Sequence, residues 1–353
     1  MVNGEIMGED VNADEASEQN MADLVKSMRS ASNETLLKTA KDIVSEKVAS
    51  SSFLNDPALE ERIPKLDIRD LKLGRVIGRG GFCTVVEIKS FGSAMSLGTR
   101  DTDGGVSLSR MIRNPFRSSR PVPGEGLDIA STAIGSLGTG SDWMSNVSGH
   151  FREEAQIVDT NGVRPIDKSK KYVVKRFWTQ NTDKITFLKG TVDLAMEARF
   201  LAALNHTNVI KIYGVSVDGP FAEGFFLVLE RMDETLTKRI KKWADIDRQC
   251  KGITGVFGSS KRKLKELEME RMLSAFEIAK GTDHLHEKGI IFRDLKPDNI
   301  GYNSNGVLKL FDFGLARELQ ESEKLEDGTY KMTGFTGALR YSKCSNGFLP
   351  LRF

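Results

Sequence analysis

The sequence predicts an α+β fold. Apolar residues alternate or run together, as they do in β-strands, in five short segments near residues 71–77, 84–88, 171–177, 210–213 and 225–229. Over residues 193–204, and again between Met272 and Leu285, apolar residues instead recur every three or four positions, which is typical of helices. We therefore expect a five-stranded antiparallel sheet followed by a mainly helical part.

The composition argues against several classes of protein. The 353 residues carry a net charge of +2, which gives no whole-chain reason to expect nucleic acid or a membrane as a partner. No apolar run approaches the length that spans a bilayer. The three cysteines, Cys83, Cys250 and Cys344, are far apart and odd in number. This pattern suits a reducing compartment rather than a disulfide framework, so we expect a protein of the cytoplasm or nucleus.

Two long segments do not show the pattern of a packed core. Residues 1–65 are polar and rich in Ser, Glu, Asn and Lys, which favours a disordered tail with a transient helix over residues 22–48. The alternative for this helix is docking on a partner. Order is expected from Leu66 onward. Residues 90–169, rich in Gly, Ser, Asn and Arg, are too long for an ordinary loop and are expected to form a disordered insertion between two strands.

The most informative stretch is the run Arg293-Asp294-Leu295-Lys296-Pro297-Asp298-Asn299, which is followed at short range by Asp312-Phe313-Gly314. At these residues the chain resembles the eukaryotic protein-kinase family in its serine/threonine branch, because Lys296-Pro297 follows Asp294-Leu295. The resemblance implies a two-lobed fold, ATP with Mg²⁺ as cofactors, and a protein Ser/Thr hydroxyl as phosphate acceptor. Without this resemblance, the alternative is that the run is a helix-to-strand connection, whose polar residues only cap the helix end and form a turn.

The resemblance also implies roles for the residues of these motifs. Asp294 would accept the hydroxyl proton, Lys296 would neutralise charge on the transferred group, and Asn299 and Asp312 would hold the magnesium. Lys175, on a strand similar to the family's Val-Ala-Ile-Lys, would pair with the ATP phosphates and with Glu197. Read alone, Glu197 is a solvent-facing helix acid.

The expected ATP pocket is formed mainly by a glycine loop and by a connector, the segment that follows the last expected strand and includes Glu230 and Met232. Its residues are Gly78, Gly80, Gly81, Val85, Val173, Lys175, Leu229, Glu230 and Met232. Glycines let backbone amides approach phosphate oxygens. The loop departs from the family pattern, since Cys83 takes the third glycine position. Gly301 replaces a bulky aliphatic residue beneath the adenine, so we expect looser packing there. Phe292 replaces the usual histidine and is expected to pack beneath Phe313.

The last expectations concern the residues that would regulate the site and the C-terminal part of the chain. Arg293 would await a phosphate on Thr333 or Thr336, placed there by an upstream kinase. Residues 342–353 stand where the family continues into Ala-Pro-Glu and the rest of a helical lobe. We therefore expect a kinase domain over 66–353, with an N-lobe at 66–230, an incomplete C-lobe at 231–341 and an atypical tail. Such a truncated kinase would be impaired or inactive; the alternative is a catalytically dead fragment that acts as a binding or dominant-negative module.

Overall fold

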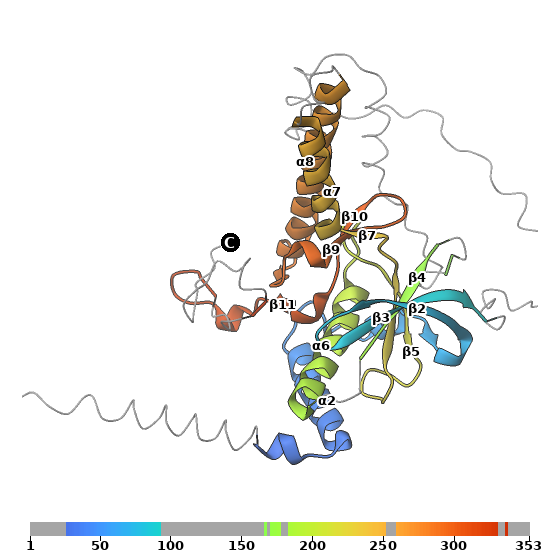
Figure 1. Cartoon of the computed structure of the whole chain (residues 1–353). Helices are drawn as coiled ribbons and strands as arrows, with labels where there is room; N and C mark the ends of the chain where they lie inside the picture. The colour runs from blue at the N-terminus through green and yellow to red at the C-terminus, as the bar shows by residue number, and fades with distance from the viewer. Residues whose placement is uncertain are drawn as a thin grey trace, which may run out of the picture. The chain divides into compact units, whose positions relative to one another are not determined.

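A computed structural model describes residues 26–92, 166–167, 170–177, 183–251, 259–330 and 336–337, and the statements below concern these residues (Figure 1). The expected insertion at 90–169 lies almost entirely outside them. Residues 338–353, on which the expectation of truncation rests, lie outside them as well.

The main sheet has six strands in the order β1-β5-β6-β4-β3-β2. Their bounds are Lys65–Leu66 (β1), Leu71–Arg79 (β2), Cys83–Phe91 (β3), Tyr172–Phe177 (β4), Ile212–Ser216 (β5) and Phe226–Glu230 (β6). Strands β2 to β6 pair antiparallel, as the sequence predicts. The two-residue β1, which the sequence analysis did not foresee, pairs parallel with β5 at the edge.

Helix α6, Lys184–Ala203, contacts the sheet through β4 and β5. The Asp183 carboxylate caps its first turn by accepting from the amides of Ile185 and Thr186. Five consecutive residues, Leu194 to Ala198, are all buried. Because five residues span more than one helical turn, α6 must be covered on more than one side.

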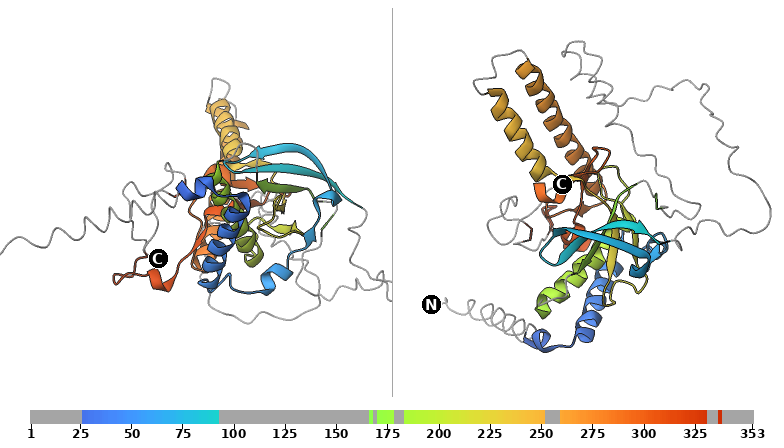
Figure 2. Two further views of the ribbon diagram at one scale, coloured as in Figure 1. Left: turned by 90° about the horizontal axis from the view of Figure 1, so that it is seen from below. Right: turned by 45° about the vertical axis from the view of Figure 1, so that its right-hand side comes forward.

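Helix α2, Asn33–Ala49, supplies that second cover (Figures 1 and 2). It begins at Ser32, whose hydroxyl accepts from the Thr35 amide, and buries Leu36, Ala40 and Val44. The expectation of a disordered tail is therefore wrong for this part of the chain: the apolar stripe of α2 packs against α6. The short helix α3, Ala58–Glu61, and the 3₁₀ turn η1, Ile68–Asp70, lead from α2 into the sheet.

The second half of the chain contains two long helices and short strands. They are β7 Glu234–Thr235, α7 Leu236–Lys251, α8 Ser259–His286, β8 Ile290–Ile291, β9 Ile300–Tyr302, β10 Leu308–Leu310 and β11 Arg317–Glu318. The 3₁₀ turns η5 Pro297–Asn299, η6 Phe313–Leu315 and η7 Glu321–Glu323 lie among them. Strands β10, β9 and β7 form one small sheet, and β11 and β8 another. The α+β class that the sequence predicts is confirmed.

The long helix α8 is only partly buried. Leu267 and Leu285 are in the core, but Met272 is 66% exposed and Phe276 48% exposed. The spacing of apolar residues predicts this helix, and α7, β8 and β10 contact it. None of the described helices is both long and apolar enough to cross a membrane.

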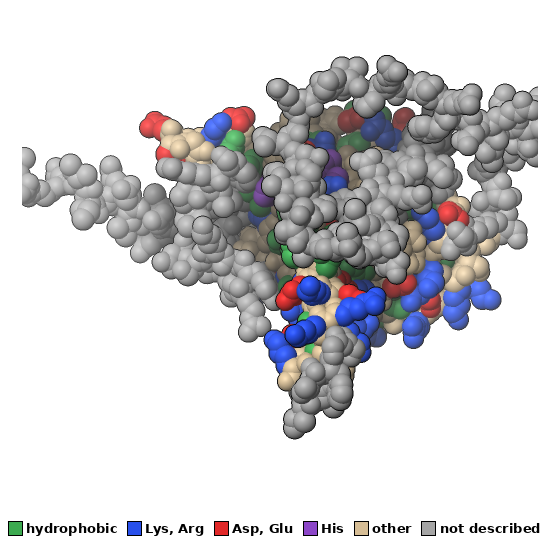
Figure 3. All heavy atoms as spheres, turned by 90° about the horizontal axis from the view of Figure 1, so that it is seen from above, with side chains coloured by type: hydrophobic (Ala, Val, Ile, Leu, Met, Phe, Trp, Pro, Cys, Tyr) green, Lys and Arg blue, Asp and Glu red, His purple; other side chains and the backbone are tan. Residues whose placement is uncertain are grey.

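Charged side chains of both signs lie side by side on the face seen in Figure 3. On α7 and α8 they form pairs one turn apart, such as Lys251 with Asp247 and Arg262 with Glu266, both at 2.9 Å. Pairs of this kind, one helical turn apart, are typical of solvent-exposed helix surfaces.

One hydrophobic core joins these parts. Its fully buried members include Leu36 of α2, Phe200 of α6, Leu227 of β6, Leu285 of α8 and Phe313 of η6. The segments that follow β6, β8 and β10 are therefore each preceded by a strand with buried residues. This core fixes the positions of the polar residues described next.

Candidate active site

A cavity of about 1100 Å³ opens between the β2–β3 hairpin, α6 and the segments that follow β6, β8 and β10. All nine residues expected to bind ATP line it, from Gly78 to Met232. So do Glu197, Asp294, Lys296, Asn299 and Asp312. The volume suits a ligand of nucleotide size.

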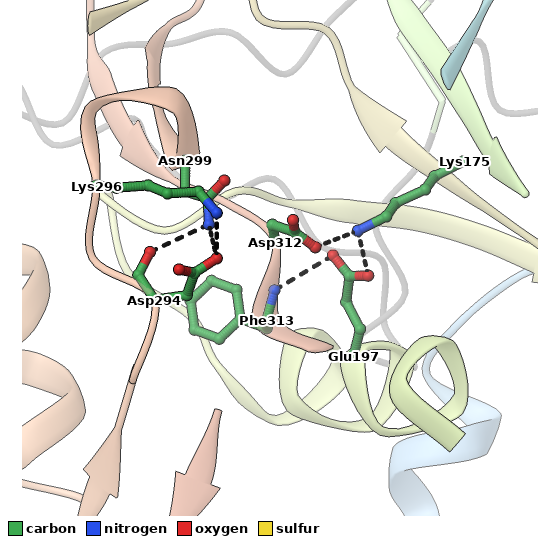
Figure 4. A network of polar contacts seen from close by, with 7 residues as sticks. All are labelled: Lys175, Glu197, Asp294, Lys296, Asn299, Asp312 and Phe313. Carbon is green, nitrogen blue, oxygen red and sulfur yellow. Dashed lines mark hydrogen bonds and ion pairs between the residues drawn. The ribbon is translucent and has the colours of Figure 1, made fainter. Parts of the chain in front are cut away.

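Lys175 lies at the centre of a buried ion network (Figure 4). Its Nζ donates to Glu197 Oε2 at 2.6 Å and to Asp312 Oδ1 at 2.7 Å. The Glu197 side chain is 1% exposed and that of Asp312 is 47% exposed. The alternative that Glu197 is a solvent-facing acid is thus wrong, because α6 directs its carboxylate at Lys175.

The three charges of this network shift one another's proton affinity. Burial alone would lower the pKa of Lys175, but the Glu197 and Asp312 carboxylates outweigh it and hold that pKa above the ordinary lysine value. In turn, the adjacent Lys175 ammonium holds the pKa of Asp312 below its usual range. Lys175 and Asp312 are therefore both ionised near neutral pH.

Asp294 lies in a second polar cluster, on the loop between β8 and η5. Its Oδ2 accepts from Lys296 Nζ at 2.6 Å and from Asn299 Nδ2 at 2.7 Å, and its backbone oxygen accepts from Asn299 Nδ2 at 3.1 Å. Figure 4 shows the amide oxygen of Asn299 directed away from Asp294. The sequence run thus folds into a tight turn that brings its three polar residues together.

The segment Asp312-Phe313-Gly314 contacts the Lys175 network on one side and Phe292, two residues before Asp294, on the other. Asp312 adopts a left-handed backbone conformation with φ 72°, which turns its carboxylate toward Lys175 while Phe313 enters the core. The Phe313 amide donates to Glu197 Oε1 at 3.4 Å. The Phe292 and Phe313 rings pack edge to face with centroids 4.9 Å apart, the contact expected for an aromatic in place of histidine.

The connector after β6 is held on both sides of Met232. The Arg231 amide donates to the Lys171 oxygen at 3.0 Å, and the Asp233 amide donates to the Tyr302 oxygen at 2.8 Å. The Glu230 carboxylate accepts from the Lys211 amide at 2.8 Å and lies 3.4 Å from the ammonium of the fully buried Lys309. This edge of the cavity is therefore rigid.

Phe311 was not foreseen as a site residue. A Cβ built on Gly301 would lie 3.1 Å from Phe311 Cε1, 3.2 Å from Met232 Cβ and 2.9 Å from the Glu234 carbonyl oxygen. Phe311, which lines the cavity, and Met232 thus fill the space that the missing aliphatic side chain would leave. The expectation of looser nucleotide packing at Gly301 stays a prediction. The sequence signal was an aromatic residue directly before Asp312.

Two further side chains of the cavity carry shifted pKa values. Burial raises the pKa of the Cys83 thiol to about 12, so this residue of the glycine loop is a neutral thiol. Burial, opposed by Lys47, raises the pKa of Asp193 on α6 to about 6. Sequence analysis missed Asp193 because it reads as an ordinary helix acid.

The residues expected to regulate the site are only partly described. Arg293 has a left-handed backbone, φ 62°, and its Nε donates to the Leu315 oxygen at 2.6 Å. Burial, together with Arg317, lowers the pKa of Arg293 to about 10. A Cβ on Gly337 would lie 2.1 Å from the Arg293 oxygen, so Thr336 is next to a residue that contacts the loop carrying Asp294. Thr333 lies outside the described residues.

Comparison with known proteins agrees with this geometry. A Wee1-like protein kinase of Arabidopsis thaliana is 36% identical over 134 residues, covering 38% of this chain and 22% of that protein. Human ribosomal protein S6 kinase alpha-1 is 30% identical over 155 residues, 44% of this chain and 17% of that protein. Ribosomal protein S6 kinase 2 beta of Xenopus laevis is 48% identical over 65 residues, 18% of this chain and 9% of that protein.

The chain spans less than a quarter of the length of these curated relatives. The family model of the protein kinase domain matches residues 160–343, more than half of the 353 residues. The matched region contains Lys175, Glu197, Asp294, Asn299 and Asp312. The chain belongs to the protein kinase family.

Proposed function

We propose that this chain is an ATP-dependent protein serine/threonine kinase that transfers the γ-phosphate to a hydroxyl of a protein substrate. One observation carries the proposal. A single cavity is lined by both the Lys175 ion network and the Asp294 cluster. The first suits phosphate binding and the second suits activation of a hydroxyl, the two tasks of phosphoryl transfer.

Each cluster has a distinct role in the proposed reaction. Lys175, held in place by Glu197, would bind the phosphates of ATP as a fixed cation. Asp294 would accept the proton of the attacking hydroxyl, and Lys296, 2.6 Å away, would stabilise negative charge on the group in transfer. Such catalysis depends mainly on positioning and electrostatics, which rigid, mutually bonded side chains supply.

Asn299 and Asp312 fit a magnesium site. The Asn299 amide group donates to Asp294, so its oxygen remains directed elsewhere. Asp312 is ionised, and nearly half of its side chain is exposed to the cavity. Amide and carboxylate oxygens suit Mg²⁺, which takes few protein ligands besides the phosphates. When bound, the ion would neutralise charge on the phosphates.

The test compares the full chain with Asp294→Asn and Lys175→Met. With Mg²⁺–ATP and a generic basic protein as substrate, we expect phosphate on Ser or Thr, identified by mass spectrometry. Asp294→Asn should slow transfer by about 10²–10⁴-fold while nucleotide still raises the melting temperature. Lys175→Met should lose both effects. Asp283→Asn, at an exposed position of α8, is the matched control and should behave as the wild type.

The same experiment separates the alternative. A chain that is stabilised by Mg²⁺–ATP but transfers no phosphate would be the catalytically dead binding module. A chain with neither nucleotide binding nor transfer would contradict the kinase function. Full turnover by Asp294→Asn would remove Asp294 from the mechanism.

A further inference from the structure

The segment from α2 to α3 contacts several parts of the proposed catalytic machinery. Leu36, Ala40 and Val44 are spaced four residues apart and so form one face of α2. All three are buried, and α2 contacts α6 and runs beside it in two views (Figures 1 and 2). At the start of α6, Lys184 Nζ donates to Asn33 Oδ1. Helix α6 is thus enclosed between the sheet and α2.

Glu197 lies in the part of α6 that is buried on all sides. Its carboxylate points at Lys175, and the neighbouring residues Leu194 and Ala198 are buried as well. An outward swing of α6 would separate Glu197 from Lys175 and also uncover Leu36 and Val44. Burial of apolar surface opposes such a swing. Helix α2 therefore favours the paired position of Glu197.

The turn after α2 is bonded to β11. The Glu318 carboxylate accepts from the Ser51 hydroxyl, from the Ser52 amide at 3.0 Å and from the Ser52 hydroxyl at 2.7 Å. Ser51 is itself fixed, because its oxygen accepts from the Leu54 amide at 2.6 Å. Glu318 and Ser51 are buried, 7% and 5% exposed. We call this set of bonds the Ser51–Ser52–Glu318 latch.

The latch reaches the catalytic loop through strand pairing. Glu318 pairs with Ile290 and Arg317 with Ile291, and Asp294 follows Ile291 by three residues. Strand β11 also begins soon after Asp312. Bonds from the N-terminal segment to Glu318 are thus bonds to the strand pair that supports both Asp294 and Asp312.

Further contacts tie the same turn to α6 and to the end of α8. Arg199 of α6 pairs with Glu60 and donates to the Leu54 oxygen at 3.4 Å. Lys288 Nζ lies 5.3 Å from the centroid of the Phe53 ring, within cation–π range. The turn therefore links α6, β11 and the approach to β8.

We propose that residues 33–61 form an intramolecular clamp that keeps α6 in the position where Glu197 pairs with Lys175. Ser51, Ser52 and Glu318 are positioning residues, since none touches the cavity residues directly. The proposal rests on the proposed kinase function for its effect on rate. Its effect on α6 does not depend on that function.

A charge reversal tests the clamp in the full chain. Ser52 is exposed, so Ser52→Glu introduces no large group into the core but places a carboxylate against Glu318. Like charges repel at this distance, and the latch should open. We expect kcat to fall about 10–100-fold with the KM for ATP changed by less than about 3-fold. Glu318→Lys alone should have a similar effect.

The double variant Ser52→Glu/Glu318→Lys restores an attractive pair and should recover most of the lost rate. Ser45→Glu, at an exposed position of α2, is the matched control and should have no effect. Amide hydrogen exchange gives a readout that does not require activity. In Ser52→Glu, exchange in α6 should accelerate about 10-fold or more while exchange in β3, β4 and β6 stays unchanged.

The outcomes are distinguishable. If the wild type transfers no phosphate but α6 exchanges faster in Ser52→Glu, the kinase function fails and the clamp stands. Unchanged exchange and rate in Ser52→Glu, or a double variant no better than either single one, would overturn the clamp. If Ser52→Glu unfolds the chain, Ser52→Ala, which removes only one donor, replaces it. If amide exchange in α6 is then no faster in Ser52→Ala than in the wild type, the clamp is overturned.

Discussion

Lys175 is shared by two carboxylates, and this arrangement predicts that Glu197→Gln and Asp312→Asn are strongly non-additive in stability. Either single variant leaves the ammonium with one carboxylate, at 2.7 Å or 2.6 Å. It also relieves repulsion between the two acids. We expect each single change to cost about 1–2 kcal/mol, close to the loss of one charge-assisted hydrogen bond.

The double variant is different in kind, because it leaves a buried ammonium without a counter-charge. The Lys175 side chain is 11% exposed, and breaking a buried ion pair in this way costs about 3–5 kcal/mol. The coupling energy should therefore be about 1 kcal/mol. Glu197→Gln should cost more than Asp312→Asn, since Asp312 is far more exposed and water can replace part of its interaction.

Urea denaturation of the four proteins near neutral pH, without nucleotide, measures these differences. Asp283→Asn serves again as an exposed control and should lie within about 0.5 kcal/mol of the wild type. Additivity of the two changes within about 0.5 kcal/mol would mean that Lys175 is not shared as the distances indicate. A larger loss for Asp312→Asn than for Glu197→Gln would contradict the ranking by burial.

Three further predictions concern other residues of the cavity and the core. Gly301→Ala should cost about 1–3 kcal/mol and reduce the rise in melting temperature with ATP, because its Cβ would lie 2.9 Å from the Glu234 carbonyl oxygen; calorimetry measures both. Burial raises the pKa of Glu277 to about 7, so the folded state loses stability as pH rises through 7. Glu277→Gln should accordingly gain on the order of 2 kcal/mol over the wild type between pH 5 and 8. Cys83, with its pKa raised to about 12, should react with iodoacetamide about 10³-fold more slowly than a free cysteine, as followed by mass spectrometry of its peptide.

The strands and the polar motifs could be predicted because their signals are local. Alternating apolar residues define β2 to β6, and the polar run 293–299 is contiguous. The Lys175–Glu197 pair depends on residues 22 positions apart, but it could still be anticipated once the strand and the helix were recognised. Each of these predictions needs only a short window of sequence and a pairing rule.

Helix α2 could not be predicted as packed structure, because its stability depends on a distant partner. Its buried face consists of Leu36, Ala40 and Val44, of which Ala40 contributes little to an apolar pattern. Most of the stability of a helix in a protein comes from the packing of its apolar face rather than from its own sequence. The surface that stabilises it is the outer side of α6, about 150 residues later in the sequence. Likewise, the sequence shows an aromatic residue directly before Asp312, but not that Phe311 lies beside Gly301, because that proximity depends on the approach of β9 to β7.

Two interactions hold α6 from opposite sides, and their consequences should differ. Glu197 binds Lys175 inside the cavity, whereas α2 and the Ser51–Ser52–Glu318 latch hold the outer side. Loss of the inner pair removes a charge interaction within a helix that remains covered, so it should lower stability without faster exchange along α6. Loss of the latch leaves the ion pair chemically intact but frees the helix that carries it, so exchange should accelerate before global stability changes. This opposite pattern separates a residue that binds Lys175 directly from a segment that positions the helix carrying that residue.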